Sequence, residues 1–402
     1  MPVKSRYAKV FQSMTCPGIY VQVPFCQSKC TYCNFPTGVV AAARFAPYAR
    51  ALCQEIAHYR SLCESAGVRL PESLDRSAVD TVYIGGGTPS LLDPRLLQEI
   101  LDAIRAHFNN ELAEVTLEAD PQTVDAWKVA GWLRAGINRV SLGVQSFSDR
   151  ELVACGRQHR AQDVHRAVVM LREAGINNIS FDLIAGLAYQ TPESWRASLD
   201  KLALLAPEHV SVYLLEVDDS SHLGKELRRG GQRYGARAVP TEDQMAECYE
   251  TACDVLSQLG YSHYEISNWA KPGFSSRHNM KYWRREPYLG FGAGAHSFSG
   301  AERWANVHDP ASYVQAIEAG SVSIEQREAV SPESALEEEL FLGLRQLQGI
   351  DLGRIESQYG VDLEKRFEPL AAVGLVERMG SLVRLAPARL SVSNEVFVAL
   401  LR

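Results

Sequence analysis

Between residues 18 and 216, six short apolar runs alternate with amphipathic helical stretches. The apolar runs cover residues 19–23, 79–84, 114–117, 139–142, 178–184 and 209–215. The helical stretches between them cover residues 45–66, 94–108, 123–135, 161–174 and 192–205. Strands that alternate with helices of this length are typical of βαβ units, which build a parallel sheet. Six consecutive units favour an α/β fold, a partial (β/α)6 barrel, over a five-stranded doubly wound sheet.

Each of the six apolar runs is followed by an unusual polar or glycine-rich cluster. In chain order these clusters read CQSKCTYC, GGGTPS, EADPQT, GVQSF, DLIAGL and LEVDD. In a parallel barrel such loops all lie at the C-terminal ends of the strands, which is the face where barrels of this kind carry their chemistry. We therefore expect these six loops to assemble one functional site.

Two further parts follow the barrel pattern. Residues 241–330 begin with a helix and continue into a segment dense in His, Gly and aromatic residues, which we expect to form extension strands and loops that close over the barrel mouth. From residue 331 the sequence reads as a capped amphipathic helix, two short helices and a hairpin around Met379 and Gly380, which is typical of a small winged-helix-like α+β domain. The predicted domains are therefore 1–240, 241–330 and 331–402.

Charge and hydropathy argue against several classes of protein. The 402 residues include 41 Lys+Arg and 48 Asp+Glu, a formal net charge of −7, which does not favour a nucleic-acid partner. Residues 331–402 hold 8 basic and 11 acidic residues, whereas a DNA-reading wing should be basic. No stretch approaches the ~20 apolar residues of a membrane span, and the N-terminus lacks the apolar run of a signal peptide. We expect a cytoplasmic protein with no membrane span.

Three of the nine cysteines, Cys26, Cys30 and Cys33, lie within eight residues of one another. Three thiolates in a loop after a strand can bind three irons of a 4Fe–4S cluster and leave the fourth iron open. A structural zinc site usually has four protein ligands, often two Cys pairs, and no second Cys pair lies nearby in the sequence. Zinc and simple burial remain the alternatives. We expect the other six cysteines to be small buried side chains, because cytoplasmic thiols stay reduced.

Taken together, the motifs resemble the radical S-adenosylmethionine (SAM) superfamily. CxxxCxxC with the aromatic residue Tyr32 before its last cysteine fits the cluster loop of that superfamily, and GGGTPS at 85–90 fits its SAM-contacting glycine motif. The ordered set YVQVPFC, GGGTP, EADP, GVQSF, GRQH, DLIAGL and HNMKYW resembles the coproporphyrinogen-dehydrogenase-like (HemN-like) branch, and within it the HemW-type haem chaperones. The resemblance covers essentially the whole chain, from Gly18 to the C-terminal domain.

The resemblance implies a 4Fe–4S cluster and SAM as cofactors, with Cys26, Cys30 and Cys33 as the metal ligands. The residues that would flank the cluster or contact the first SAM are Tyr20, Tyr32, Gly86, Gly87, Thr88 and Glu118. The residues that match positions around a second SAM in porphyrinogen-oxidising relatives are Gln145, Arg157 and Asp182. Glu118 is suited to accept hydrogen bonds from the amino or ribose groups of SAM. An arginine such as Arg157 can pair with the carboxylate of SAM.

The HNMKYW motif at 278–283 adds a haem expectation. The His278 imidazole can bind haem iron, and the rings of Tyr282 and Trp283 can line the macrocycle. From the residues alone, a capping histidine beside core aromatics is an equal alternative; the match to the HNxxYW element of the HemW group implies the haem role. We expect His263 and His296 to be structural, and His159 and His165 to lie at the surface.

Two departures separate this chain from the oxygen-independent coproporphyrinogen III oxidases. Those enzymes usually carry a further cysteine two positions after the third cluster ligand, where this chain has Phe35, and a longer segment before the cluster loop. We therefore expect a haem chaperone that binds haem and a SAM-ligated 4Fe–4S cluster and transfers haem to an acceptor protein of unknown identity. The alternatives are the oxidase itself, acting through a SAM-derived radical, or a radical enzyme for another tetrapyrrole. We assign no catalytic residue and leave SAM cleavage open.

Overall fold

A 12-stranded sheet in the order β14-β13-β12-β11-β1-β4-β5-β6-β7-β8-β10-β9 forms the centre of the computed structural model, which describes residues 16–71, 74 and 78–400. Its middle consists of six parallel strands that are neighbours in chain order. These strands are β1 (Gly18–Val23), β4 (Val79–Gly86), β5 (Asn110–Ala119), β6 (Arg139–Gln145), β7 (Asn178–Ala185) and β8 (His209–Leu214). The predicted partial (β/α)6 barrel is confirmed. The first 15 residues of the predicted domain 1–240 lie outside the described residues.

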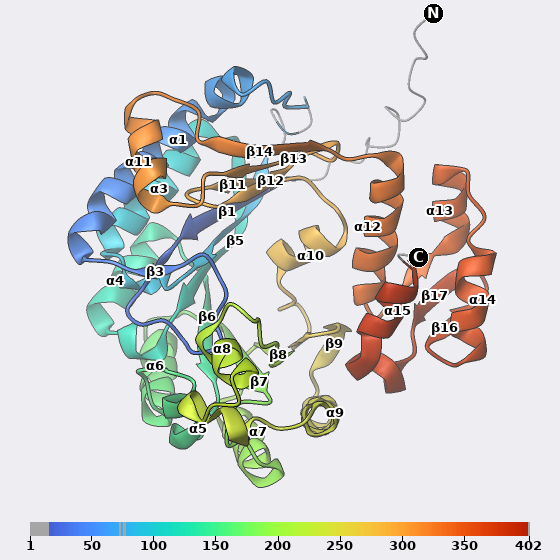
Figure 1. The fold of residues 1–402 in the computed structure, drawn as a ribbon. Helices are drawn as coiled ribbons and strands as arrows, with labels where there is room; N and C mark the ends of the chain where they lie inside the picture. The colour runs from blue at the N-terminus through green and yellow to red at the C-terminus, as the bar shows by residue number, and fades with distance from the viewer. Residues whose placement is uncertain (1–15, 72–73, 75–77, 401–402) are drawn as a thin grey trace, which may run out of the picture.

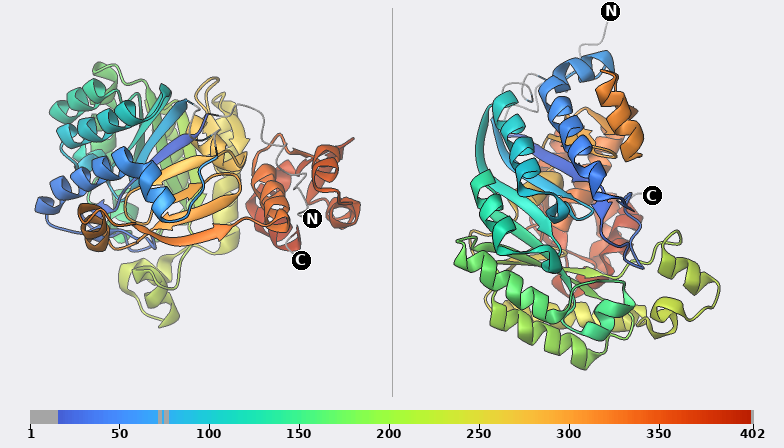
Figure 2. Two further views of the ribbon diagram at one scale, coloured as in Figure 1. Left: turned by 90° about the horizontal axis from the view of Figure 1, so that it is seen from above. Right: turned by 90° about the vertical axis from the view of Figure 1, so that its left-hand side faces the viewer.

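Helices cover one face of the six strands (Figures 1 and 2). Many side chains on the other face are buried and polar, among them Thr81, Thr116, Ser141 and Ser180. The covering helices are α1 (Phe45–Ser65), α3 (Pro94–His107), α4 (Ala126–Ala135), α6 (Ala161–Glu173) and α7 (Pro192–Leu205). Alternate strand residues such as Val140 and Leu142 belong to the apolar core beneath them. The residues between these point the other way. We call this inner face the lumen; it carries Thr81, Tyr83, Thr116, Glu118, Arg139, Ser141, Ser180, Asp182 and His209, whose side chains hydrogen-bond on that face.

Helix starts follow the capping residues in the sequence. Thr191 caps α7 and accepts a hydrogen bond from the Ser194 amide at 3.2 Å. α4 begins at Ala126, three residues later than expected, because Asp125 is its cap and Pro121–Thr123 forms a separate short 3-10 turn. Two short helices, α5 (Asp149–Ala154) and α8 (His222–Arg228), lie in the loops after β6 and β8.

Residues 241–330 lengthen the sheet at both ends. β9 (Ser262–Glu265) and β10 (Asn268–Ala270) continue it beyond β8, and β11 (Tyr288–Phe291) pairs parallel with β1. The other elements are α9 (Glu242–Gln258), α10 (Arg277–Trp283), β12 (His296–Phe298), β13 (Glu302–Asn306), α11 (Pro310–Glu318) and β14 (Ile324–Ala329). The domain boundary at 240/241 stays a prediction. Strands from both sides of it belong to one sheet, since β10 pairs with β8 and β11 pairs with β1.

Helix α10, which carries the HNMKYW motif, does not close the barrel mouth as expected. The His278 Nδ1 atom lies 3.0 Å from the Thr81 Oγ1 atom, near the start of β4. A Cβ atom on Gly18, the first residue of β1, would lie 3.0 Å from the His278 ring. The helix therefore sits at the N-terminal ends of these strands, opposite the face where the six motif loops lie.

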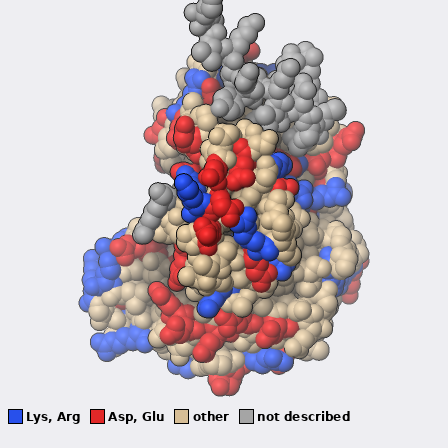
Figure 3. Space-filling model, turned by 90° about the vertical axis from the view of Figure 1, so that its right-hand side faces the viewer, with Lys and Arg blue, Asp and Glu red and all other residues tan. Residues whose placement is uncertain are grey.

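The C-terminal domain has the expected winged-helix-like make-up. It contains α12 (Pro332–Arg345), α13 (Leu352–Tyr359), α14 (Glu364–Ala372), α15 (Ser393–Leu400) and a sheet of β15 (Ile350–Asp351), β17 (Leu382–Leu385) and β16 (Val376–Met379). Arg285 and Arg303 on the barrel extension both donate to the Glu338 carboxylate of α12, each at 2.8 Å. Figure 3 shows acidic and basic side chains intermixed on this side of the molecule, without one continuous basic surface. Within the described ranges, no helix is long and apolar enough to cross a bilayer.

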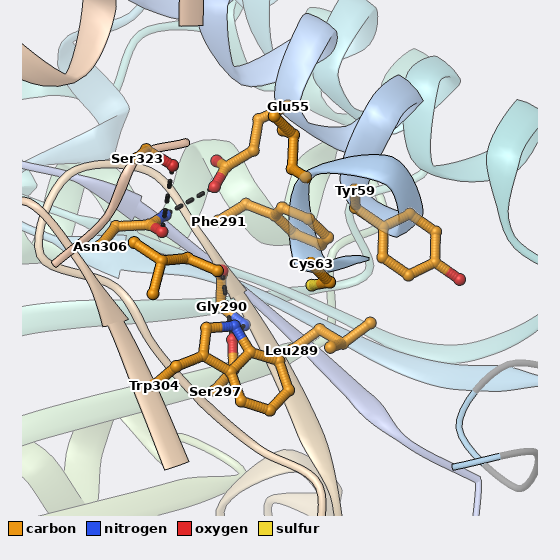
Figure 4. A pocket seen from close by; sticks show the side chains of 12 residues that line it. Glu55, Tyr59, Cys63, Leu289, Gly290, Phe291, Ser297, Trp304, Asn306 and Ser323 are labelled. Atoms are coloured by element: carbon orange, nitrogen blue, oxygen red, sulfur yellow. Dashed lines mark hydrogen bonds between the residues drawn. The ribbon is translucent and has the colours of Figure 1, made fainter. Parts of the chain in front are cut away.

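A buried carboxylate joins helix α1 to the extension strands (Figure 4). Glu55 is only 5% exposed and accepts hydrogen bonds from Tyr313 (2.6 Å), the Gly292 amide (2.8 Å) and Asn306 (2.6 Å). Burial raises the pKa of Glu55, and these donors oppose that rise. The three donors come from α11, the loop after β11, and β13, so one side chain fixes α1 against three segments of the extension.

Replacing Glu55 with Ala should destabilise the protein by about 3 kcal/mol, because three buried donors would lose their acceptor. The matched control is Glu64→Ala on the same helix, which is exposed and should change stability little. Urea unfolding followed by circular dichroism measures the difference. Equal midpoints for the two variants would show that Glu55 does not anchor the extension.

Candidate active site at the strand ends

The three motif cysteines lie in one loop at the C-terminal end of β1. The strand continues through β2 (Phe25–Cys26), which pairs with β3 (Gly38–Val39). The Cys33 amide donates to the Cys30 carbonyl at 3.2 Å, which folds the loop back on itself. All three thiols are partly buried. Burial raises the pKa of Cys33, and the neighbouring Cys30 and Cys26 thiols add to that rise.

The ligand set, rather than the spacing of the thiols, favours an iron–sulfur cluster. Three cysteines in one loop can each bind a separate iron of a 4Fe–4S cluster and leave the fourth iron open, whereas structural zinc usually takes four protein ligands. Across the described residues, no three His, Cys, Asp or Glu side chains are grouped closely enough to hold a metal ion.

The glycine motif pairs with the chain that leads into the cysteine loop. The Gly87 amide donates to the Val23 carbonyl at 2.9 Å, and the Thr88 amide donates to the Phe25 carbonyl at 2.7 Å. A Cβ atom on Gly87 would lie 2.5 Å from the Phe25 oxygen, so this position has no room for a side chain. The sequence led us to expect that these glycines contact SAM. The structure adds a second reason: Gly87 packs directly against the backbone beside Cys26.

Glu118 lies at the end of β5 next to the glycine motif. Its Oε1 atom accepts from the Tyr83 hydroxyl at 2.9 Å, and its Oε2 atom accepts from the Gly86 amide at 3.0 Å. Burial raises the pKa of Glu118 to about 7 despite these donors. The Tyr20 ring stacks on Tyr83 with centroids 6.1 Å apart, and its hydroxyl donates to Gln22 at 2.6 Å. Three of the predicted residues, Tyr20, Gly86 and Glu118, are thus brought together.

A small cleft connects the cysteine loop with Arg157. The Arg157 Nη1 atom lies 3.7 Å from the Cys30 sulfur, and its Nη2 atom donates to the Gly143 carbonyl. The cleft is lined by Gln27, Ser28, Cys30, Thr88, Asp120, Arg157 and Gln158. Cys30, Thr88 and Arg157, which the sequence predicts as ligand or cofactor residues, therefore line the same cleft.

Two residues of this site were missed or misplaced from sequence. Asp120 lies 3.6 Å from Arg157 Nη2 and 3.5 Å from His159 Nδ1. Burial opposes ionisation of Asp120, but the hydrogen bond from His159 and the charge of Arg157 outweigh it and lower its pKa. The expectation that His159 is at the surface is wrong: it is fully buried, and its Nε2 atom lies 3.1 Å from the Val144 carbonyl. The EADP motif contained the signal for Asp120, beside Glu118.

The remaining predicted residues lie nearby in different surroundings. Gln145 ends β6 with a positive φ of 62°. Asp182 accepts from the Ser141 hydroxyl at 3.0 Å, and burial raises the pKa of Asp182. Tyr32 packs into a separate apolar cluster with Leu223 and Ala236.

His278 is placed at the other end of the barrel. It is fully buried, with Nδ1 3.0 Å from Thr81 Oγ1 and Nε2 2.8 Å from the Tyr282 hydroxyl. Burial, followed by the charges of Lys281 and Arg139, lowers the pKa of His278 to about 3. The imidazole is therefore neutral, and both ring nitrogens have partners. A haem-binding role for His278 stays a prediction, and it requires one of these contacts to open.

Residues 20–202 match the model of the radical SAM superfamily, and residues 330–393 match that of the HemN C-terminal domain. The chain is 34% identical over 388 residues to the heme chaperone HemW of Bacillus subtilis, covering 95% of this chain and 98% of that protein. The chain belongs to the HemW family of heme chaperones. The Synechocystis HemW protein is 35% identical over 364 residues, 88% of this chain and 84% of that protein.

The solved structure of coproporphyrinogen III oxidase (HemN) from Escherichia coli is similar in fold to this chain. The TM-score is 0.80 at 22% sequence identity, covering 97% of this chain and 91% of that chain. This likeness confirms the predicted fold class, a radical SAM barrel followed by a small C-terminal domain. Membership of the superfamily implies a 4Fe–4S cluster and SAM.

Replacing Gly87 with Ala should reduce both cluster content and SAM binding, because the new Cβ atom meets the backbone next to Cys26. The control is Gly38→Ala in the same loop region, where a Cβ atom would meet nothing within 4 Å. Iron analysis and SAM titration of anaerobically reconstituted protein measure the two effects. A Gly87→Ala variant with full iron content and weaker SAM binding would show that the glycine serves SAM alone.

Glu118 predicts a pH dependence near neutrality. Because its pKa is about 7, SAM affinity should rise by up to about tenfold from pH 6 to pH 7.5 as the carboxylate forms. Its pKa is raised above the ordinary 4.5, so this group makes the apoprotein less stable as pH rises from about 4.5 to about 7. Glu118→Gln should flatten both profiles, and Glu111→Gln, exposed on the same strand, should flatten neither. Calorimetry and thermal melts across this range give both readouts. Unchanged profiles in Glu118→Gln would refute the role.

Proposed function

We propose that this protein binds haem at the HNMKYW end of its barrel and passes it to an acceptor protein, while the cluster and SAM occupy the opposite end. One observation carries the proposal: α10 contacts the starts of β1 and β4, whereas the cysteine and glycine loops follow the ends of these strands. Thr81 and Gly86 are five residues apart on β4, which corresponds to roughly 16 Å. The barrel thus offers two separate sites.

The cofactor end would be held by the residues predicted from the sequence, of which Cys30, Thr88 and Arg157 line one cleft. Cys26, Cys30 and Cys33 are the proposed cluster ligands. Tyr20, Tyr32, Gly86, Gly87, Thr88 and Glu118 are the proposed surroundings of the cluster and the first SAM, and Gln145, Arg157 and Asp182 those of a second SAM. When bound, the cluster and SAM supply one-electron chemistry that side chains lack. Within the protein, Glu118 offers a hydrogen-bond acceptor, and Arg157 offers a charge that Asp120 and the Gly143 carbonyl hold beside Cys30.

The haem end rests on His278. With a pKa near 3, its imidazole carries no extra proton at neutral pH, which is the form that binds iron. Its Nε2 atom now faces the Tyr282 hydroxyl, so iron would take the place of that hydroxyl. Trp283, the next residue on the same helix, is partly exposed. The centroid of its ring lies 4.5 Å from the Cζ atom of the Arg345 guanidinium. We further propose the cytoplasm as the location; the acceptor protein is of unknown identity.

Anaerobic reconstitution followed by haem titration tests the two-site proposal. Cys30→Ala should lose the cluster and keep about one haem per chain, whereas His278→Ala should keep the cluster and weaken or shift the haem spectrum. Cys53→Ala and the exposed His165→Ala are the controls and should lose neither.

Two results would contradict the proposal. Loss of haem together with the cluster in Cys30→Ala would place both at one site. Sustained decarboxylation of coproporphyrinogen III, without stoichiometric haem binding, would assign the protein to the oxidases instead.

A further inference from the structure

Arg139 is a charged residue buried inside the barrel. It is the first residue of β6 and is only 1% exposed. The next residue, Val140, belongs to the apolar core under the helices, so the Arg139 side chain faces the lumen. No motif singled it out, because it lies at the start of a strand rather than in the loop that follows one.

The Arg139 guanidinium has few partners. Its Nη1 atom reaches the Thr116 hydroxyl only at 3.5 Å, and its Nε atom has no hydrogen-bond partner. Within the part of the chain that the structure describes, it forms no ion pair. Burying an arginine in this way is costly unless an anion compensates for the lost hydration.

The carboxylates of the lumen do not fill this role. The positive charge of Arg139 partly opposes the rise that burial causes in the pKa of Glu118 and of Asp182. The oxygens of these two carboxylates, however, accept hydrogen bonds from other groups. Glu114 accepts from the backbone amides of Arg277 and His278 at 3.0 Å each, at the start of α10. Each acid is already committed, and Arg139 is left with unused donors.

The other groups around Arg139 are neutral. His209 has Nδ1 2.8 Å from the Ser180 hydroxyl and Nε2 2.7 Å from the Tyr264 hydroxyl. Burial, then the charge of Arg139, lowers the pKa of His209, and the same charge helps to lower that of His278. Arg139 thus carries a permanent positive charge among hydroxyls, neutral imidazoles and carboxylates that already accept other hydrogen bonds, and its unpaired Nε donor is suited to an anionic ligand.

We propose that Arg139 binds a carboxylate of a ligand that enters the lumen. Guanidinium groups favour carboxylates because two parallel N–H donors match the two oxygens. Resting on the proposed function, two ligands of this protein carry such a group: haem, through its propionates, and SAM, through its amino-acid end. Arg139 contacts Thr116 on β5, two residues before Glu118, and its charge reaches His278 on α10. It can therefore serve a ligand at either end.

The structure also predicts how the apoprotein responds. Arg139→Met keeps an unbranched, flexible stem and removes a buried charge that forms no ion pair among the described residues. The melting temperature should therefore stay the same or rise, since groups kept for binding often reduce stability. If Arg139 only supported the fold, the same substitution should lower the melting temperature.

The experiment compares each ligand with a partner that lacks the carboxylate. Affinities are measured for haem against haem dimethyl ester, and for SAM against decarboxylated SAM, in full-length wild type, Arg139→Met and Arg139→Lys. Arg284→Met, exposed on the C-terminal side of α10, is the control. In one pair the wild type should prefer the acid by tenfold or more. Arg139→Met should abolish that preference, Arg139→Lys should restore part of it, and Arg284→Met should keep it.

The outcomes separate the possibilities. The pair that loses its preference in Arg139→Met identifies the source of the carboxylate. Equal preferences in wild type and Arg139→Met for both pairs would overturn the inference, as would a wild type with no preference in either pair. Absence of any haem binding by the wild type would instead count against the proposed function, and the SAM pair would still decide the role of Arg139. Should Arg139→Met fail to fold, the preferences of the wild type and Arg139→Lys decide.

Discussion

The architecture depends on the alternation of side chains along six parallel strands. One set of residues, such as Val140 and Leu142, is buried under helices and holds the sheet together. The other set faces inward and consists of Ser, Thr, Tyr, His and charged residues, each of which needs a hydrogen-bond partner once it is buried. Several find one on the neighbouring strand, as Ser180 of β7 does with His209 of β8 at 2.8 Å. The same alternation that stabilises the fold therefore buries polar groups on the inner face. Among the described residues, the Arg139 guanidinium forms no ion pair there, and its Nε atom has no hydrogen-bond partner.

The site at the strand ends is coupled through backbone rather than through side chains alone. The glycine motif continues the pairing of β4 with β1 beyond the strand ends, so the loop assigned to SAM and the loop assigned to the cluster share hydrogen bonds at Gly87 and Thr88. Glu118 fixes the Gly86 amide from the next strand. These hydrogen bonds join the glycine motif to the chain that leads into the cysteine loop and to the end of β5, so loops far apart in sequence form one site.

Much of the fold and of the cofactor site could be predicted from sequence because both follow local patterns. Strand and helix periodicity defined the barrel, and the strand-end motifs located Cys30, Thr88, Glu118 and Arg157 on one face. The position of α10 could not be predicted, because it depends on the packing of His278 against Thr81 across 197 residues of chain. For the same reason, the burial of His159 beside Asp120 was missed: a histidine in a loop before a helix gives no local sign of its tertiary partner.

The central claim is that one barrel carries two separate sites at opposite ends. The most direct test is the distance between the cluster and the haem iron, measured by pulsed electron paramagnetic resonance in protein that holds both. The strand length predicts two distinct centres separated by roughly 15–25 Å. Haem iron coupled directly to the cluster at contact distance would contradict this arrangement.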